Sequence, residues 1–198
     1  MYRTSLATRR IPSNYDSGQQ QRVFADYVAS EHSLLELGCG KGEVLCGLEC
    51  HAKAGVEADA NLAAIAADKG IDVRPTIDSF AGTTFDRLLV GEEPRDLTLD
   101  DLRQLRTLLS QTGLLLISRP IDDEGRLLRP MEYREHTESL RELLRESQFT
   151  VDSISVRRYS YRTSPFQFGN SDSPTKTSER TYWMVKPFLS LVAVARRG

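Results

Sequence analysis

The chain has 198 residues, of which 39% are hydrophobic and 27% are charged, as expected of one globular domain with a sizeable core. No apolar run approaches the ~20 residues that cross a bilayer, and no secretory signal follows Met1, so we expect a cytoplasmic protein without a membrane partner. With 26 basic and 28 acidic residues, the net charge is −2, which gives no general attraction to nucleic acid.

Short apolar runs alternate along the chain with segments of helical periodicity. The predicted strands cover residues 33–37, 54–57, 71–76, 85–90, 114–117, 151–156 and 189–195. The predicted helices cover residues 16–30, 43–48, 62–69, 98–113 and 137–148. This alternation predicts an α/β fold in which a mostly parallel sheet carries helices on both faces.

Two of the predicted helices begin with a capping signal. Thr98 and Asp101 resemble a capping box, with Asp in place of the usual Glu at the fourth position. Asp59 precedes the helix over 62–69 and is interpreted as its N-cap, with a cofactor contact as the alternative.

The three cysteines, Cys39, Cys46 and Cys50, contain no C-x-x-C pair. We interpret them as small hydrophobic side chains in a reducing compartment. The neighbouring His51 completes no recognisable ligand spacing, so we expect no metal site.

The segment Glu36-Leu37-Gly38-Cys39-Gly40-Lys41-Gly42 lies between a predicted strand and a predicted helix. Glycine at alternate positions lets the backbone turn sharply and approach a ligand without a Cβ in the way. An NAD fingerprint would need glycine where Glu43 stands, and a P-loop would need Ser or Thr where Gly42 stands. Glu57 closes the next strand, where α/β folds place a carboxylate beside a ribose diol. We therefore expect a ligand with ribose hydroxyls and little negative charge.

Segment 36–42 resembles the first motif of class I S-adenosylmethionine-dependent methyltransferases. Residues 55–59 resemble their second motif, and residues 78–80, 85–90, 112–117 and 139–155 resemble the later turns, strands and helix. The resemblance runs from about Leu34 to Arg196. It implies a Rossmann-like three-layer sandwich around a seven-stranded sheet, with an antiparallel last strand and S-adenosylmethionine over the carboxyl ends of the first strands.

The resemblance also implies which residues contact the cofactor: Glu36, Gly38, Cys39, Gly40, Gly42, Glu57, Asp78 and Ser79. The glycine turn would line the methionine part, and Glu36 would help to place its ammonium group. Glu57 would accept both ribose hydroxyls, and the Asp78-Ser79 pair would meet the adenine edge.

From this resemblance we expect a methyltransferase that acts on an O, N or C atom of a small molecule. Residues 1–30 would form an N-terminal segment with a lid helix, and residues 31–198 the cofactor-binding domain with a loop insertion at 161–180. No catalytic residue is evident, and His136, Tyr133 and Glu92 are the candidates for a base.

Two other functions remain open on the sequence. The short loop at 91–96 lacks the acceptor signatures of base or glutamine methylation, which favours a cofactor-binding partner subunit with reduced activity. A methyltransferase acting on nucleic acid or protein is the second alternative. Residues 157–162 interleave arginine and tyrosine as single-strand-binding platforms do, but strand alternation at a surface edge explains this equally well, and we expect no nucleic-acid partner.

Overall fold

The computed structural model describes residues 17–91, 97–120, 130–162 and 185–198. The helices are α1 (Ser17–Ala25), α2 (Glu43–Cys46), α3 (Ala60–Ala67), the 3-10 helix η1 (Ile77–Phe80), α4 (Leu99–Leu108) and α5 (Pro130–Glu146). The strands are β1 (Ser33–Leu37), β2 (Ala52–Val56), β3 (Asp72–Arg74), β4 (Phe85–Val90), β5 (Leu109–Pro120), β6 (Phe149–Arg162) and β7 (Val185–Arg197). No helix among these described residues is long and apolar enough to cross a membrane.

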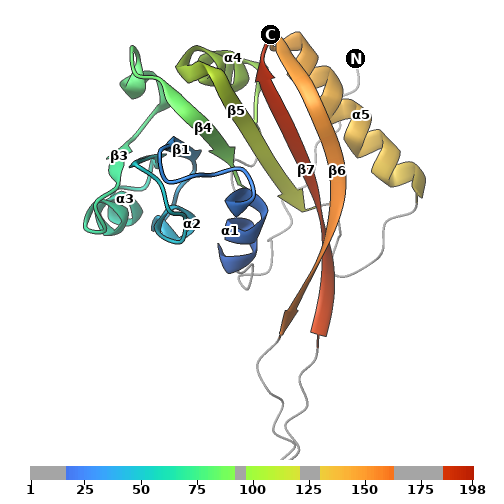
Figure 1. Ribbon diagram of the computed structural model, residues 1–198, viewed down its shortest axis with the longest axis horizontal. Coiled ribbons are helices and arrows are strands. Elements are labelled where there is room, and N and C mark those ends of the chain that lie inside the picture. The colour runs from blue at the N-terminus through green and yellow to red at the C-terminus, as the bar shows by residue number, and fades with distance from the viewer. Residues whose placement is uncertain (1–16, 92–96, 121–129, 163–184) are drawn as a thin grey trace, which may run out of the picture.

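The seven strands form one sheet in the order β3-β2-β1-β4-β5-β7-β6 (Figure 1). The pairs β3–β2, β2–β1, β1–β4 and β4–β5 are parallel, whereas β7 is antiparallel to both β5 and β6. The expected α/β fold, with seven strands and an antiparallel last strand, is confirmed. The carboxyl ends of β1, β2, β3, β4 and β5 therefore meet at one edge of the sheet. Residues 38–42, called the glycine turn below, follow β1 at this edge.

Two apolar layers cover the two faces of this sheet, because successive side chains of a strand point to opposite faces. Leu34 belongs to the layer that includes Val23 and Phe24 of α1 and residues of α2 and α3. Leu35 belongs to the other layer, which includes residues of η1, α4 and α5. The three-layer sandwich is thus built from consecutive strand residues, and α1 is anchored in the same core as the rest.

Several predicted bounds are wrong in the second half of the chain. The helix expected over 98–113 ends at Leu108, and Leu109 already pairs with Phe85 of β4. The next pair is Arg87 with Leu114, so residues 110–113 form an irregularity between the two pairs. A Cβ on Gly113 would lie 2.6 Å from Leu109 Cδ1, so glycine lets the chain fold back there.

The strands expected at 114–117, 151–156 and 189–195 are also much longer than predicted. They span Leu109–Pro120, Phe149–Arg162 and Val185–Arg197. Charged and polar residues inside them interrupt the apolar pattern on which the predictions depended, and pairing with neighbouring strands extends the regular structure across those residues. The helix expected over 137–148 begins earlier, at Pro130, where proline suits the first helical position.

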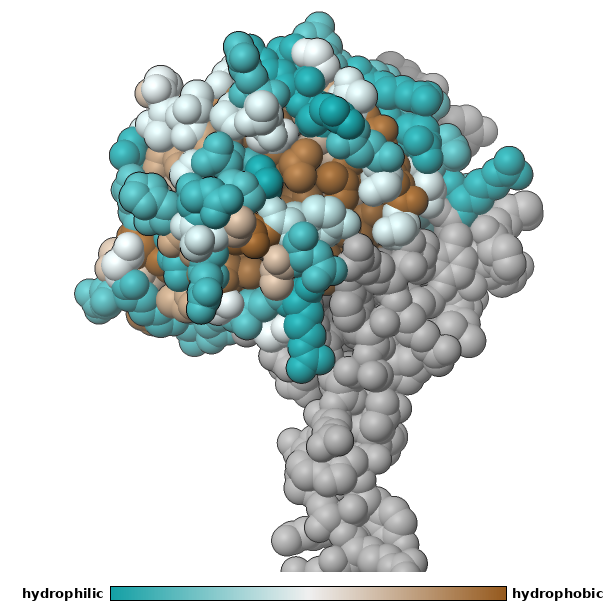
Figure 2. Space-filling view, in the orientation of Figure 1, coloured by the Kyte–Doolittle hydropathy of each residue, from teal (hydrophilic) through white to brown (hydrophobic). Residues whose placement is uncertain are grey.

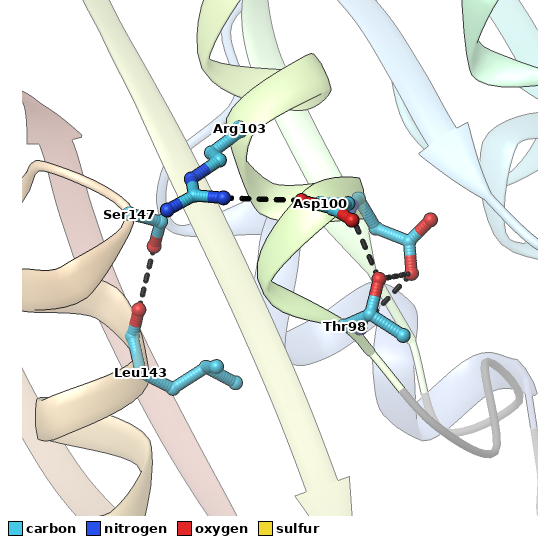
Figure 3. A network of polar contacts seen from close by, with 6 residues as sticks. Thr98, Asp100, Arg103, Leu143 and Ser147 are labelled. Carbon is cyan, nitrogen blue, oxygen red and sulfur yellow. Dashed lines mark hydrogen bonds and ion pairs between the residues drawn. The ribbon is translucent and has the colours of Figure 1, made fainter.

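Local capping fixes the helices of the α4–α5 layer (Figure 3). The Thr98 hydroxyl accepts the Asp101 N–H at 3.1 Å, and the Asp101 carboxylate accepts the Thr98 N–H at 2.9 Å. The predicted capping box is therefore confirmed. Arg103 pairs with Asp100 at 3.1 Å along the same helix, and the Ser147 hydroxyl donates to the Leu143 carbonyl at the end of α5.

Candidate functional site

The glycine turn leaves β1 at the carboxyl edge of the sheet and is fastened to β2. Gly38, Gly40 and Gly42 have φ values of 73°, 53° and 73°, a left-handed conformation that favours glycine. The N–H groups of Gly38 and Cys39 both donate to the Val56 carbonyl, at 2.9 and 3.1 Å. The turn is therefore held in position by the backbone of the neighbouring strand.

Gly40, Gly42 and Gly55 differ in the atoms that surround them. A Cβ on Gly42 would overlap the Ile71 side chain and approach Ala66 of α3 at 3.2 Å, so this glycine permits close packing on α3. A Cβ on Gly55 of β2 would overlap the Cys39 side chain, which fills the space above that strand. A Cβ on Gly40 would meet no atom within 4 Å. Gly40 alone among these three thus opens onto free space.

Glu57, the residue after β2, holds both the glycine turn and the start of α3. Its Oε2 atom accepts the Gly40 N–H at 2.9 Å, and its Oε1 atom accepts the Asp59 N–H at 2.8 Å. Asp59 in turn caps α3 by accepting the N–H groups of Asn61 and Leu62, which confirms its predicted role as N-cap. The carboxylate predicted to meet a ribose therefore lies directly beside the open position at Gly40.

Glu36 lies one residue before the end of β1 and is only 3% exposed. Its Oε2 atom is buried without a hydrogen-bond partner among the described residues. Burial raises the pKa of Glu36 to about 8, because a carboxylate loses its hydration there. Since a lone buried carboxyl is costly, its presence beside the glycine turn indicates a site that a polar or cationic group completes.

Cys39 is also buried, and its thiol lies close to both carboxylates. Burial, followed by the negative charges of Glu36 and Glu57, raises its pKa to about 12. The thiol is therefore a packing group and not a nucleophile. Because the Cys39 side chain packs on Gly55, the residue offers a ligand its backbone only.

The Asp78-Ser79 pair lies on η1, which follows β3 at the same edge of the sheet. Both side chains are exposed, and the Ser79 hydroxyl is 2.9 Å from that of Thr76. The Arg74 guanidinium donates to the Ser79 carbonyl, while the Arg74 carbonyl accepts the Glu57 N–H at 3.0 Å. Arg74 thus ties η1 to the end of β2. The structure brings the ends of β1, β2 and β3 together, and the roles of the individual residues toward a cofactor stay predictions.

Sequence reasoning did not identify Gln20, which lies on α1 beside this edge. Its side chain is 7% exposed, and a Cβ on Gly91, just after β4, would lie 3.1 Å from Gln20 Nε2. Ser118 of β5 is fully buried. It lies on the same face of the sheet as Glu36, because each stands two positions after a residue of the α1 layer, Leu116 and Leu34. The available signal was a polar residue at a core position, Gln20 preceding Val23 and Phe24 by helical spacing.

The candidate bases are not gathered at this turn in the part of the chain that the structure describes. His136 is exposed on α5, whose buried residues pack in the layer opposite to α1. Tyr133 falls within the same helix, but its side chain is outside the described residues, as are Glu92 and most of the loops at 91–96 and 161–180. The base assignment stays open.

A second polar cluster lies at the opposite, amino-terminal edge of the sheet. Asp86 Oδ2 accepts the Ser33 N–H at 3.0 Å and the Ser33 hydroxyl at 2.8 Å, and these bonds lower the Asp86 pKa. Arg87 donates to the Tyr27 carbonyl at 2.6 Å. These residues connect β1, β4 and the chain after α1, and they stabilise the scaffold far from the glycine turn.

The surface around α1, α2 and α3 is mostly hydrophilic, with hydrophobic residues showing between the helices (Figure 2).

No protein-family model matches the sequence, and no curated protein matches it. Solved structures do match the fold. Precorrin-6y C5,15-methyltransferase from Geobacter metallireducens has a TM-score of 0.60 at 10% identity, covering 97% of this chain and 95% of that one.

Two further solved structures extend the comparison. The ribosomal protein L11 methylase of Lactobacillus delbrueckii has a TM-score of 0.58 at 13% identity, covering 93% of this chain and 81% of its own. A SAM-dependent methyltransferase of Thermotoga maritima has a TM-score of 0.56 at 20% identity, covering 92% and 89%. At these identities the likeness is one of fold. The chain has the fold of class I S-adenosylmethionine-dependent methyltransferases, as its motifs predicted.

Proposed function

We propose that the protein is a methyltransferase that moves the methyl group of S-adenosylmethionine to a small-molecule acceptor. The observation that carries the proposal is the contact between Glu57 and Gly40, which places a carboxylate beside the open position of a left-handed glycine turn. The fold and the position of this turn at the carboxyl edge of a parallel sheet support it.

The described residues fit this cofactor. A carboxylate has about four acceptor sites, and Glu57 uses two of them for N–H groups, which leaves capacity for two ribose hydroxyls. The Oε2 atom of Glu36 has no hydrogen-bond partner among the described residues and suits the ammonium group of the methionine part. The absent Cβ of Gly40 leaves room for the ligand. Asp78 and Ser79 are the residues we assign to the adenine edge.

When bound, S-adenosylmethionine supplies a methyl group that its sulfonium charge has already activated. The work left to this chain is to orient the acceptor and exclude water, and orientation contributes on the order of 7–11 kcal/mol in well-aligned reactions. We assign the exclusion of water to residues 1–30, whose helix α1 is anchored by the buried Val23 and Phe24. His136, Tyr133 and Glu92 are the candidates for a base where the acceptor arrives protonated.

Calorimetry with S-adenosylmethionine, S-adenosylhomocysteine and NAD tests the cofactor assignment. We expect binding of the first two and none of NAD, because Glu43 stands where the NAD fingerprint needs glycine and its carboxylate would repel a diphosphate. Transfer of a labelled methyl group to a panel of small acceptors tests the activity. Binding of NAD without a response to S-adenosylmethionine would contradict the proposal.

Two other functions have an observation in their favour. A partner subunit with reduced activity would bind S-adenosylmethionine without turnover on any acceptor, and the absence of a base beside the glycine turn among the described residues favours it. A nucleic-acid methyltransferase is favoured by the sequence of residues 157–162, in which arginine and tyrosine are interleaved. The acceptor panel should therefore include single-stranded oligonucleotides.

A further inference from the structure

We propose that Gln20 of α1 is a specificity-determining residue whose side-chain amide binds the carboxylate of the methionine part of S-adenosylmethionine. The inference rests on the proposed function, because it takes S-adenosylmethionine as the ligand. It adds to that function a contact from α1, which lies outside the turns that follow the strands.

Gln20 is a buried polar side chain without a partner. It is 7% exposed, yet its amide forms no hydrogen bond to any residue in the part of the chain that the structure describes. Its neighbour Gln21 differs, since the Gln21 Nε2 atom donates to the Glu43 carbonyl at 2.7 Å. Burying an amide without a hydrogen bond costs free energy, and buried polar groups in native proteins are as a rule paired. Gln20 therefore indicates a contact that a ligand completes.

The Gln20 amide lies at the carboxyl edge of the sheet. A Cβ on Gly91, the residue after β4, would lie 3.1 Å from Gln20 Nε2 and 3.3 Å from Gln20 Oε1. Figure 1 shows α1 beside the end of β4. Glycine at position 91 thus lets the amide approach the backbone where β4 ends, which is the edge that carries the glycine turn.

Gln20 and Glu36 lie on the same face of the sheet, at a spacing that suits one small group. Leu34 and Leu89 belong to the α1 layer, and Glu36 and Gly91 stand two positions after them. Glu36 pairs with Leu89 in the parallel register, so Gly91 is one strand and two residues away from Glu36. At ~4.8 Å between strands and ~3.3 Å per residue, the Cα atoms of Glu36 and Gly91 are roughly 8 Å apart. The Glu36 carboxyl and the amide above Gly91 can therefore contact the two ends of one amino-acid head group.

The two unpartnered groups have complementary chemistry. The Oε2 atom of an ionised Glu36 accepts hydrogen bonds and pairs with a cation, whereas the Gln20 amide carries two N–H donors. An α-amino acid carries an ammonium group and a carboxylate on one carbon atom. With the ammonium group at Glu36, the carboxylate needs a donor nearby, and the Gln20 amide supplies it. The pair therefore selects the amino-acid head group of the cofactor.

Calorimetry with S-adenosylmethionine and decarboxylated S-adenosylmethionine tests the assignment, because the two compounds differ only in the carboxylate. Gln20→Met removes the amide and keeps the length of the side chain. It should weaken S-adenosylmethionine binding about tenfold, as expected for the loss of a hydrogen bond to a charged group. The affinity for the decarboxylated compound should change less than twofold.

Two further variants separate the carboxylate contact from neighbouring effects. Glu36→Gln should weaken the binding of both compounds alike, because both carry the ammonium group. Gln21→Met removes the next amide along α1, which is bonded to the Glu43 carbonyl. It is the matched control, and we expect it to leave the affinity for both compounds within threefold.

The stability of the cofactor-free protein provides a second measurement. Gln20→Met should raise the urea midpoint, because a buried amide without a partner is replaced and no internal hydrogen bond is lost. Gln21→Met should lower the midpoint, since the bond to the Glu43 carbonyl is lost. A lower midpoint for Gln20→Met would show that the amide serves the fold, and it would overturn the assignment.

The binding results distinguish failure of this inference from failure of the proposed function. Binding of neither compound by the wild-type chain would contradict the proposed function, and the assignment of Gln20 with it. Where the wild type binds, equal losses for both compounds in Gln20→Met would show an indirect effect on the site. No loss for either compound would show that Gln20 does not contact the cofactor. Each of these last two results would overturn the assignment and leave the proposed function in place.

Discussion

The two halves of the sheet are built differently, although they share one core. In the first half, β1, β2 and β3 have five, five and three residues, and the side chains of Glu57 and Asp59 hold the segments that follow β1 and β2. In the second half, β5, β6 and β7 have 12 to 14 residues, and the last two continue beyond their neighbours. The turns of the first half are thus held in place by side chains, whereas the long strands of the second half extend past their neighbours.

We expect positions proposed for binding to be distinct from positions that serve packing. Within the glycine turn, Gly40 is the position proposed for binding, and Gly42, two residues later, is the position that serves packing. The predictions below test whether the separation holds, first inside the turn and then between the two layers.

The largest effect is expected from Gly42→Ala. Alanine would have to adopt the left-handed φ of Gly42, and its Cβ would overlap the Ile71 side chain. Together these effects should lower the unfolding free energy by about 2–5 kcal/mol. Gly40→Ala, with the same kind of φ but open space around it, should cost only about 1 kcal/mol and yet weaken S-adenosylmethionine binding. Urea unfolding and calorimetry on both variants measure this. Equal stabilities would contradict the assigned difference in packing.

Glu36 should make stability depend on pH in a defined direction. Its pKa is about 8 in the folded protein and 4.5 ordinarily, so the folded state keeps a proton that the unfolded state releases between these values. Stability from this group is therefore full below about pH 4.5 and is lost as the pH rises to about 8. Between pH 5 and pH 8, the wild type should lose on the order of a few kcal/mol more than Glu36→Gln.

Urea unfolding of the cofactor-free protein at both pH values checks this expectation. Parallel pH profiles for the wild type and Glu36→Gln would show that Glu36 is ionised in the folded protein. The same variant should bind S-adenosylmethionine more weakly, because an amide cannot pair with an ammonium group as a carboxylate does.

Glu57→Ala should lower S-adenosylmethionine affinity at least tenfold. Two hydrogen bonds to a charged acceptor are at stake, and 1.4 kcal/mol is a factor of ten. Asp59→Ala is the matched control, since it removes a carboxylate two residues away that only caps α3. We expect it to cost about 1 kcal/mol of stability and to leave the affinity within threefold. An unchanged dissociation constant in folded Glu57→Ala would remove Glu57 from the site.

The smallest effect is expected from Thr98→Ala on the far side of the sheet. Loss of the α4 cap should reduce the unfolding free energy by about 1 kcal/mol without changing cofactor affinity. A change in affinity measured by calorimetry would mean that the two layers are coupled, contrary to the separation described above.

The sequence was most informative where structure is local. The strands at Ser33–Leu37 and Phe85–Val90 were predicted with their observed bounds, and so were both capping signals. The glycine turn was identified because its spacing is a short-range property. The α/β pattern placed Glu57 at the end of the next strand, but its contact with Gly40, 17 residues away, was not predicted.

The parts that escaped prediction depend on distant partners. The helical spacing of the sequence assigns Leu109 to a helix, whereas its pairing with Phe85 of β4 places it in a strand. The strand expected at 151–156 continues to Arg162, into the loop insertion expected at 161–180, because its pairing with β7 continues that far. The helical spacing from Gln20 to Val23 and Phe24 indicates a polar residue at a core position, but nothing near it in the sequence indicates that Gly91 will lie against it.

The buried thiol of Cys39 makes the state of the glycine turn chemically observable. With a pKa of about 12 and little exposure, Cys39 offers an alkylating reagent almost no thiolate while the turn is closed. Cys46, on α2, is exposed and should be labelled first. Labelling of Cys39 requires local opening of the structure around it, so we expect a ligand bound at the glycine turn to lengthen the delay between the two modifications.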